Sequence, residues 1–146
     1  MDPAFFRLFN EIGILEQLSR AAFEARLPKG MLVSHFSVLN HLIRVRDGRT
    51  PLEISTAFQV PKTTLTHTLA GLEKAKLIEM RPNPDDARSK QVWITEAGRK
   101  FREQAIQSMA GDLAGLETEF SLERVQKILP ELEALRIIMD RRRDLD

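Results

Sequence analysis

A helix start signal near the middle of the chain constrains the fold more than any other feature. Thr50-Pro51-Leu52-Glu53 is a capping box with proline at the first helical position, since the Thr50 hydroxyl can accept from the Glu53 N–H while the Glu53 carboxylate reaches back. The helix is short because Val60-Pro61 interrupts it. A second helix, from about Lys62 to Ala75, is predicted by apolar residues at helical spacing, namely Leu65, Leu69 and Leu72.

Two strands with a charged tip are predicted directly after this helix pair. Ile78–Arg81 and Gln91–Ile94 have the composition of strands, and a turn-rich segment lies between them, Pro82-Asn83-Pro84-Asp85-Asp86. A short helix, a turn, a second helix and a hairpin are the layout of a winged helix-turn-helix. The predicted fold class is therefore mainly α, with this winged lobe and further helices on both sides of it.

The helices before the lobe are predicted from their caps. Asp2 followed by Pro3 is typical of an N-cap and a first-turn proline, and the amphipathic helix that follows should end near Leu27-Pro28-Lys29-Gly30. Ser34 is expected to cap a second helix, which stops near Asp47-Gly48.

The helices after the hairpin are predicted in the same way. Thr95 is expected to cap one long helix whose apolar face continues as far as Phe120. Ser121 is expected to cap a last helix, which should kink at Pro130.

The domain organisation follows from these helices. We expect residues 1–146 to form a single domain with a winged helix lobe at residues 31–95. The segments 1–30 and 96–146 carry apolar stripes larger than a small core requires, and we expect them to form a two-fold dimerisation platform. Packing of these stripes on each other within one chain is the alternative.

Composition excludes several classes of function. The chain is 42% hydrophobic and 29% charged with a net charge of +1, so any basic patch must be local. It has no cysteine, which removes disulfides, thiolate zinc sites and cysteine nucleophiles. Neither a membrane-spanning run nor a signal peptide is expected, which favours a cytoplasmic protein. Without a glycine-rich phosphate loop, serine elbow or metal-ligand spacing, we expect no enzyme, cofactor or metal.

The second helix of the pair carries the candidate base-reading residues. In a helix-turn-helix, the N-terminal residues of that helix contact base edges in the major groove. Here they are small donors and acceptors with one cation, namely Lys62, Thr63, Thr64, Thr66 and His67. A polar, solvated helix face is the alternative for any one of them.

The hairpin tip is the second candidate contact with DNA. Arg88, Ser89 and Lys90 lie there, and arginine is favoured in a narrow minor groove. Asp86 is expected to hold Arg88 or to tie the wing to the domain. Three arginines before the first short helix could meet phosphates or be plain surface, namely Arg44, Arg46 and Arg49.

Three motifs together resemble the multiple-antibiotic-resistance regulator (MarR) family of bacterial transcription factors. They are Leu72-Glu73-Lys74, Asp86-Ala87-Arg88 and Ile94-Thr95-Glu96-Ala97-Gly98. The resemblance implies one MarR-type domain that acts as a homodimer on an inverted-repeat operator in double-stranded DNA, often as a repressor.

The chain departs from the family pattern at three positions. Lys76 stands where the family usually has a glycine that ends the helix in a left-handed turn, so this helix end is expected to be shaped differently. His67 replaces a frequent arginine, and Pro61 replaces a frequent capping serine.

The resemblance also implies a place for an effector. Family members often bind small aromatic or anionic ligands between the platform and the lobe, where the facing residues here would be Phe9, Ile12, His35, Phe36 and Leu39. The alternatives are an apolar core and, for His35, a hydrogen-bonded histidine at a helix start. A metal site is not expected, because His35, His41 and His67 are scattered.

A winged helix that binds proteins, or an antirepressor without its own operator, is the rival interpretation. It would favour acidic or apolar residues on the recognition face. Residues 61–68 instead carry Lys62 and His67 and no acid.

Overall fold

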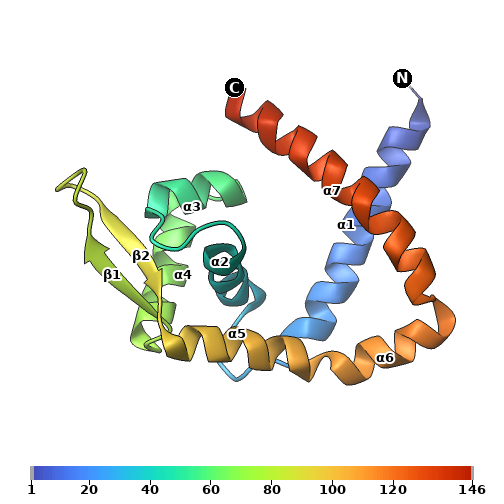
Figure 1. The fold of residues 1–146 in the computed structure, drawn as a ribbon, viewed down its shortest axis with the longest axis horizontal. Coiled ribbons are helices and arrows are strands. Elements are labelled where there is room, and N and C mark those ends of the chain that lie inside the picture. Colours follow the sequence, from blue (N-terminus) through green and yellow to red (C-terminus); the bar gives the residue numbers. More distant parts are fainter. Residues whose placement is uncertain (1, 146) are drawn as a thin grey trace. The chain divides into compact units, whose positions relative to one another are not determined.

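The computed structural model describes residues 2–145, which contain seven helices and a two-stranded sheet. The chain divides into two compact units, Met1–Ser108 and Met109–Asp146. The first unit holds α1 (Pro3–Glu24), α2 (Val33–Arg44), α3 (Pro51–Phe58), α4 (Lys62–Lys74), β1 (Ile78–Pro82), β2 (Lys90–Ile94) and α5 (Glu96–Ser108) (Figure 1). The second holds α6 (Ala110–Glu119) and α7 (Leu122–Leu145).

The core of the first unit lies between α2, α3, α4 and the hairpin. Leucines spaced three and four residues apart on α4 point into it, as predicted, and join buried residues from the other elements. The cluster comprises Val38, Leu39, Leu42, Ile54, Leu65, Leu69, Leu72, Leu77, Ile78, Val92 and Ile94. The sheet is antiparallel, with Ile78 opposite Ile94 and Pro82 opposite Lys90.

Four predicted helix caps are confirmed, and one of them is Thr95, whose hydroxyl accepts from the Gly98 N–H at 3.0 Å at the start of α5. The Asp2 side chain accepts from the Ala4 N–H at 2.8 Å, and the Ser121 hydroxyl accepts from the Arg124 N–H at 3.4 Å. Both halves of the capping box at α3 form, since the Glu53 N–H donates to Thr50 Oγ1 at 3.2 Å and the Thr50 N–H donates to Glu53 Oε1 at 3.1 Å.

The predicted cap of α2 was wrong. The helix starts at Val33, so Ser34 lies inside its first turn. Two other side chains satisfy the free N–H groups there: His35 Nδ1 accepts from the Leu32 N–H at 2.9 Å, and Glu24 Oε1 accepts from the Val33 N–H at 3.1 Å.

The single long helix predicted after Thr95 was also wrong, because it is divided at Met109 into α5 and α6. The Ser108 hydroxyl donates to the Ala105 carbonyl at 2.7 Å, a contact of a kind that bends helices. Gly111 and Gly115 follow and weaken the helix further. Helix α7 continues through Pro130, and the kink expected there stays a prediction.

The end of α4 keeps the left-handed turn despite its lysine, so the expected change of shape was wrong. Lys76 has a φ of +61°. The Lys76 N–H donates to the Glu73 carbonyl at 2.9 Å and the Leu77 N–H to the Leu72 carbonyl at 3.0 Å, the two bonds of a Schellman motif. The motif is thus formed by a residue that disfavours its conformation.

The outer helices expose much apolar surface. Exposed residues of α1 include Phe5, Phe6, Leu15 and Leu18, and neither α6 nor α7 has a buried residue among those described. None of the helices in residues 2–145 is long and apolar enough to cross a membrane.

Candidate nucleic-acid interface

Helix α4 has two faces with different chemistry. Its buried face consists of Leu65, Thr68, Leu69 and Leu72. All five predicted base-reading residues lie on the exposed face, namely Lys62, Thr63, Thr64, Thr66 and His67. The Thr66 hydroxyl donates to the Lys62 carbonyl at 2.8 Å, so its proton is engaged while its oxygen can still accept.

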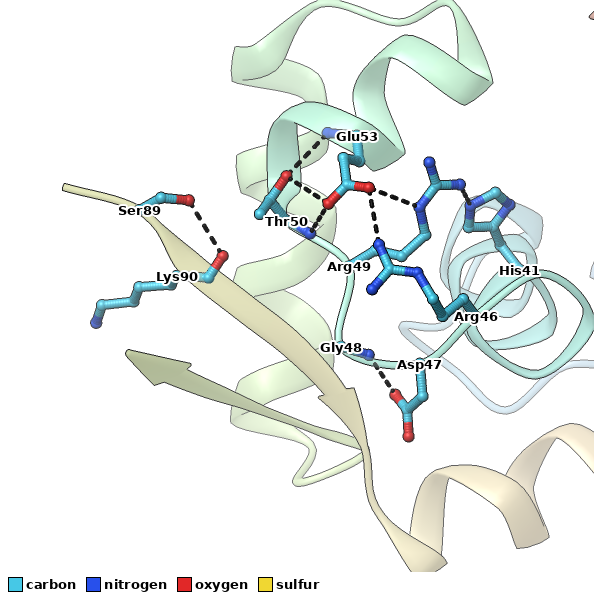
Figure 2. A network of polar contacts seen from close by, with 9 residues as sticks. All are labelled: His41, Arg46, Asp47, Gly48, Arg49, Thr50, Glu53, Ser89 and Lys90. Carbon is cyan, nitrogen blue, oxygen red and sulfur yellow. Dashed lines mark hydrogen bonds and ion pairs between the residues drawn. The ribbon is translucent and has the colours of Figure 1, made fainter. Parts of the chain in front are cut away.

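The hairpin tip presents an exposed arginine beside a carboxylate. The Arg88 side chain is 93% exposed. Asp86 Oδ1 accepts from the Arg88 N–H at 2.9 Å and lies 3.4 Å from Arg88 Nε. Of the two roles expected for Asp86, the structure shows the contact with Arg88. The Ser89 hydroxyl donates to the Lys90 carbonyl at 3.4 Å (Figure 2).

An open groove of about 740 Å³ lies between α4 and the hairpin tip. It brings together Lys62 and Thr66 of α4, the start of α3, and the predicted wing residues Asp86, Arg88, Ser89 and Lys90. Thr63, Thr64 and His67 do not line it, although they lie on the exposed face of α4. Residues from both predicted contact regions therefore face one space.

Two of the three arginines before α3 are paired with Glu53 (Figure 2). Glu53 Oε2 lies 2.9 Å from Arg46 Nη2 and 3.5 Å from Arg49 Nε. Burial acts to raise the pKa of Glu53, but hydrogen bonds from Thr50 and the charges of Arg46 and Arg49 outweigh it and lower that pKa. Arg49 Nη1 also lies 2.8 Å from His41 Nε2, so this arginine joins α2 to the start of α3.

The five residues expected to line an effector site do not share one environment. Leu39 belongs to the core and His35 is 8% exposed, whereas Phe9 is 42% exposed on α1. Phe36 packs edge-to-face against Phe23 at 4.6 Å between ring centroids, and Ile12 is partly exposed. His35 is hydrogen-bonded at a helix start, as the alternative interpretation predicted.

Burial lowers the pKa of His35, and the nearby charge of His67 lowers it further. Within residues 2–145, no group of three or more histidine, aspartate or glutamate side chains is placed to hold a metal ion.

One residue with several polar contacts was missed by the sequence-based prediction. Asp47 was expected only to mark a helix end.

The fold and the groove define a winged helix-turn-helix protein, and comparison with known proteins shows what it is similar to. The sequence profile of the MarR family matches residues 29–89. The transcriptional regulator HosA of Escherichia coli O111:H- is 26% identical over 130 residues, which cover 84% of this chain and 95% of HosA. The transcriptional activatory protein BadR of Rhodopseudomonas palustris is 26% identical over 141 residues, which cover 90% of this chain and 79% of BadR.

Solved structures agree. Wild-type MarR from E. coli in its apo form superposes with a TM-score of 0.74 at 25% identity, covering 88% of this chain and 96% of that one. A mutant MarR from E. coli complexed with operator DNA has the same fold, with a TM-score of 0.71 at 24% identity over 91% and 96% of the two chains. In its winged helix lobe by sequence, and over most of its length by fold, the chain is therefore similar to transcription regulators of the MarR family.

Proposed function

We propose that this protein is a transcription regulator of the MarR type, which binds a specific double-stranded DNA operator as a homodimer and represses transcription there. The supporting observation is the exposed, acid-free start of α4 beside the groove, with Arg88 extended on its other side. Hydroxyls and one cation suit base edges and phosphates in a major groove, while the arginine suits the adjacent minor groove. DNA as the ligand would place the protein in the cytoplasm.

The homodimer rests on the exposed apolar residues of the outer helices. Residues 1–30 and 96–146 would form the platform, and residues 31–95 would form the DNA-binding lobe. A two-fold axis would then present two α4 helices to successive major grooves, about 34–36 Å apart on an inverted repeat. A self-complementary apolar surface is what such a closed dimer requires.

Release by a small aromatic or anionic effector would complete the regulatory cycle. Phe9, Ile12, His35, Phe36 and Leu39 are the proposed contacts. A ligand shifts a conformational equilibrium only if its affinity differs between the two conformations. The effector would therefore have to bind more tightly to a dimer whose two DNA-binding lobes are spaced wrongly for the two half-sites.

Selection from random duplexes followed by fluorescence anisotropy tests the proposal. The expected result is enrichment of an inverted repeat, bound with one dimer per site and with a steep dependence on salt from counterion release. A reporter gene behind that repeat should then be repressed. Failure to enrich any sequence would contradict the proposal and favour a winged helix that binds proteins.

A further inference from the structure

The carboxylate of Asp47 joins three separate parts of the first unit. Its Oδ1 atom accepts from the Ile94 N–H at 2.9 Å and from the Gly48 N–H at 3.0 Å (Figure 2 shows the second contact). Its Oδ2 atom lies 3.5 Å from Arg99 Nη2 on α5. The side chain is 23% exposed, so these contacts are partly shielded from water.

This carboxylate completes a row of hydrogen bonds along the edge of β2 that faces away from β1. The Gly48 N–H donates to the Val92 carbonyl at 2.9 Å, and the Val92 N–H donates to the Arg49 carbonyl at 2.8 Å. The next N–H on that edge belongs to Ile94, and it is the Asp47 side chain that accepts from it. Residues 47–49 therefore act as a short third strand whose last contact is a side chain.

The same few residues also fix the start of the helix-turn-helix. Thr50 follows directly and caps α3, while β2 leads back from Ile94 to Lys90 at the wing tip. Loss of the carboxylate would leave the Ile94 N–H without an acceptor in a residue that is 8% exposed. The strand would then keep only the two backbone hydrogen bonds of Val92 on this edge, and its Ile94 end could shift relative to α3 and α4.

We infer that Asp47 is a positioning residue for DNA binding: its carboxylate fixes β2 against the α2–α3 loop and thereby sets where the wing tip carries Arg88. This inference rests on the proposed function, because it assumes that the wing contacts DNA. Asp47 itself would touch no nucleotide.

A double-mutant cycle tests whether Asp47 acts through the wing. Asp47→Ala and Arg88→Ala should each weaken operator binding by about tenfold, and the double variant should bind no more weakly than Arg88→Ala alone. Additive losses, about a hundredfold in the double variant, would overturn the inference. So would a folded Asp47→Ala protein with unchanged affinity.

The only tryptophan gives a readout that does not need DNA. Trp93 lies between Val92 and Ile94 on β2, the chain has no tyrosine, and a Cβ at Gly48 would come within 2.5 Å of the indole. Asp47→Ala should shift the Trp93 emission to the red and increase its quenching by acrylamide, while circular dichroism stays that of a folded protein. An unchanged Trp93 signal would refute the displacement of β2.

Two further variants separate positioning from general loss of stability. Asp47→Asn keeps an oxygen that can accept from the Ile94 N–H and should behave like the wild type in both assays. Asn40→Ala removes another link to α5, the 3.1 Å contact with Arg102 Nη2, and should leave the Trp93 signal unchanged. If Asp47→Asn instead matches Asp47→Ala, the inferred hydrogen bond is not the cause. A wild-type protein without selective DNA binding would contradict the proposed function, while the Trp93 signal would still show whether Asp47 holds β2 in place.

Discussion

The imidazole of His35 fills the space that the missing side chain of Gly71 leaves on α4. A Cβ added at Gly71 would lie 2.8 Å from His35 Nε2, closer than real contacts allow. The other ring nitrogen, Nδ1, accepts from the Leu32 N–H. One buried ring thus caps α2 and packs against the recognition helix, which makes both residues useful probes of the lobe.

Gly71→Ala should destabilise the protein by about 1–2 kcal/mol, because overpacking against His35 outweighs the higher helix propensity of alanine. Urea unfolding measures this. Gly13→Ala is the matched control, since Gly13 is helical and has nothing within 4 Å of the added Cβ. The control should be neutral or stabilising. Equal changes in the free energy of unfolding at both positions would show that the contact with His35 does not affect stability.

Stability should fall as the pH drops below about 6.5, the ordinary histidine pKa. The pKa of His35 is lowered in the folded state by burial and then by His67, so the unfolded chain binds the proton more readily and acid favours unfolding. Thermal melts from pH 8 to pH 5 check this. The His35→Gln variant keeps an acceptor at the same capping position but does not titrate. Its melting temperature should therefore fall less between pH 8 and pH 5 than that of the wild type. A variant with the wild-type pH profile would assign the effect to other groups.

Lys76→Gly should stabilise the protein by about 1 kcal/mol, because glycine adopts the left-handed conformation of Lys76 without steric cost. The melting temperature should rise accordingly. Lys74→Gly, two residues earlier and inside α4, should instead destabilise by about 1 kcal/mol. If both variants raised or both lowered the melting temperature, the left-handed turn at Lys76 would not explain the effect.

Arg88→Ala should weaken operator binding by about tenfold and reduce the salt dependence by about one counterion, without changing the dimer. Anisotropy at several salt concentrations measures both quantities. Arg81→Ala removes the same charge from strand β1, where Arg81 contacts Glu79 at 3.0 Å and lies over the Trp93 ring. Its effect should be smaller. Wild-type affinity of the Arg88 variant would remove the wing from the proposed interface.

Leu15→Glu should dissociate the proposed dimer, because it places a charge in the exposed apolar stripe of α1. Light scattering after gel filtration gives the mass. Leu52→Glu is the control: this leucine is 56% exposed but lies on α3, beside the groove, so the variant should stay dimeric while losing affinity for DNA. A Leu15 variant that remains dimeric would exclude α1 from the platform.

Local features of the fold could be predicted from the sequence. The capping box at Thr50 and Glu53 involves residues three positions apart, so composition and spacing were sufficient. The boundaries of α4 and the strands were also close to those predicted, because Pro61 and the turn residues mark them. The exposed positions of Lys62, Thr63, Thr64, Thr66 and His67 followed from the spacing of the leucines on the opposite face.

Contacts between distant residues could not be predicted in this way. Nothing near Asp47 indicates that its carboxylate accepts from an N–H 47 residues further along. Arg46 and Arg49 resembled free cations in the sequence, yet Glu53 pairs with both. The division at Met109 interrupts a continuous apolar pattern, so the spacing of apolar residues did not reveal it.

The absence of buried residues from α6 and α7, in the part of the chain that is described, has a consequence for gene dosage. Helices without a core of their own gain most of their stability from another surface. If a second copy provides that surface, the folded fraction depends on protein concentration by mass action. Operator occupancy would then rise more steeply than the amount of protein made, so halving expression would reduce the active regulator by more than half.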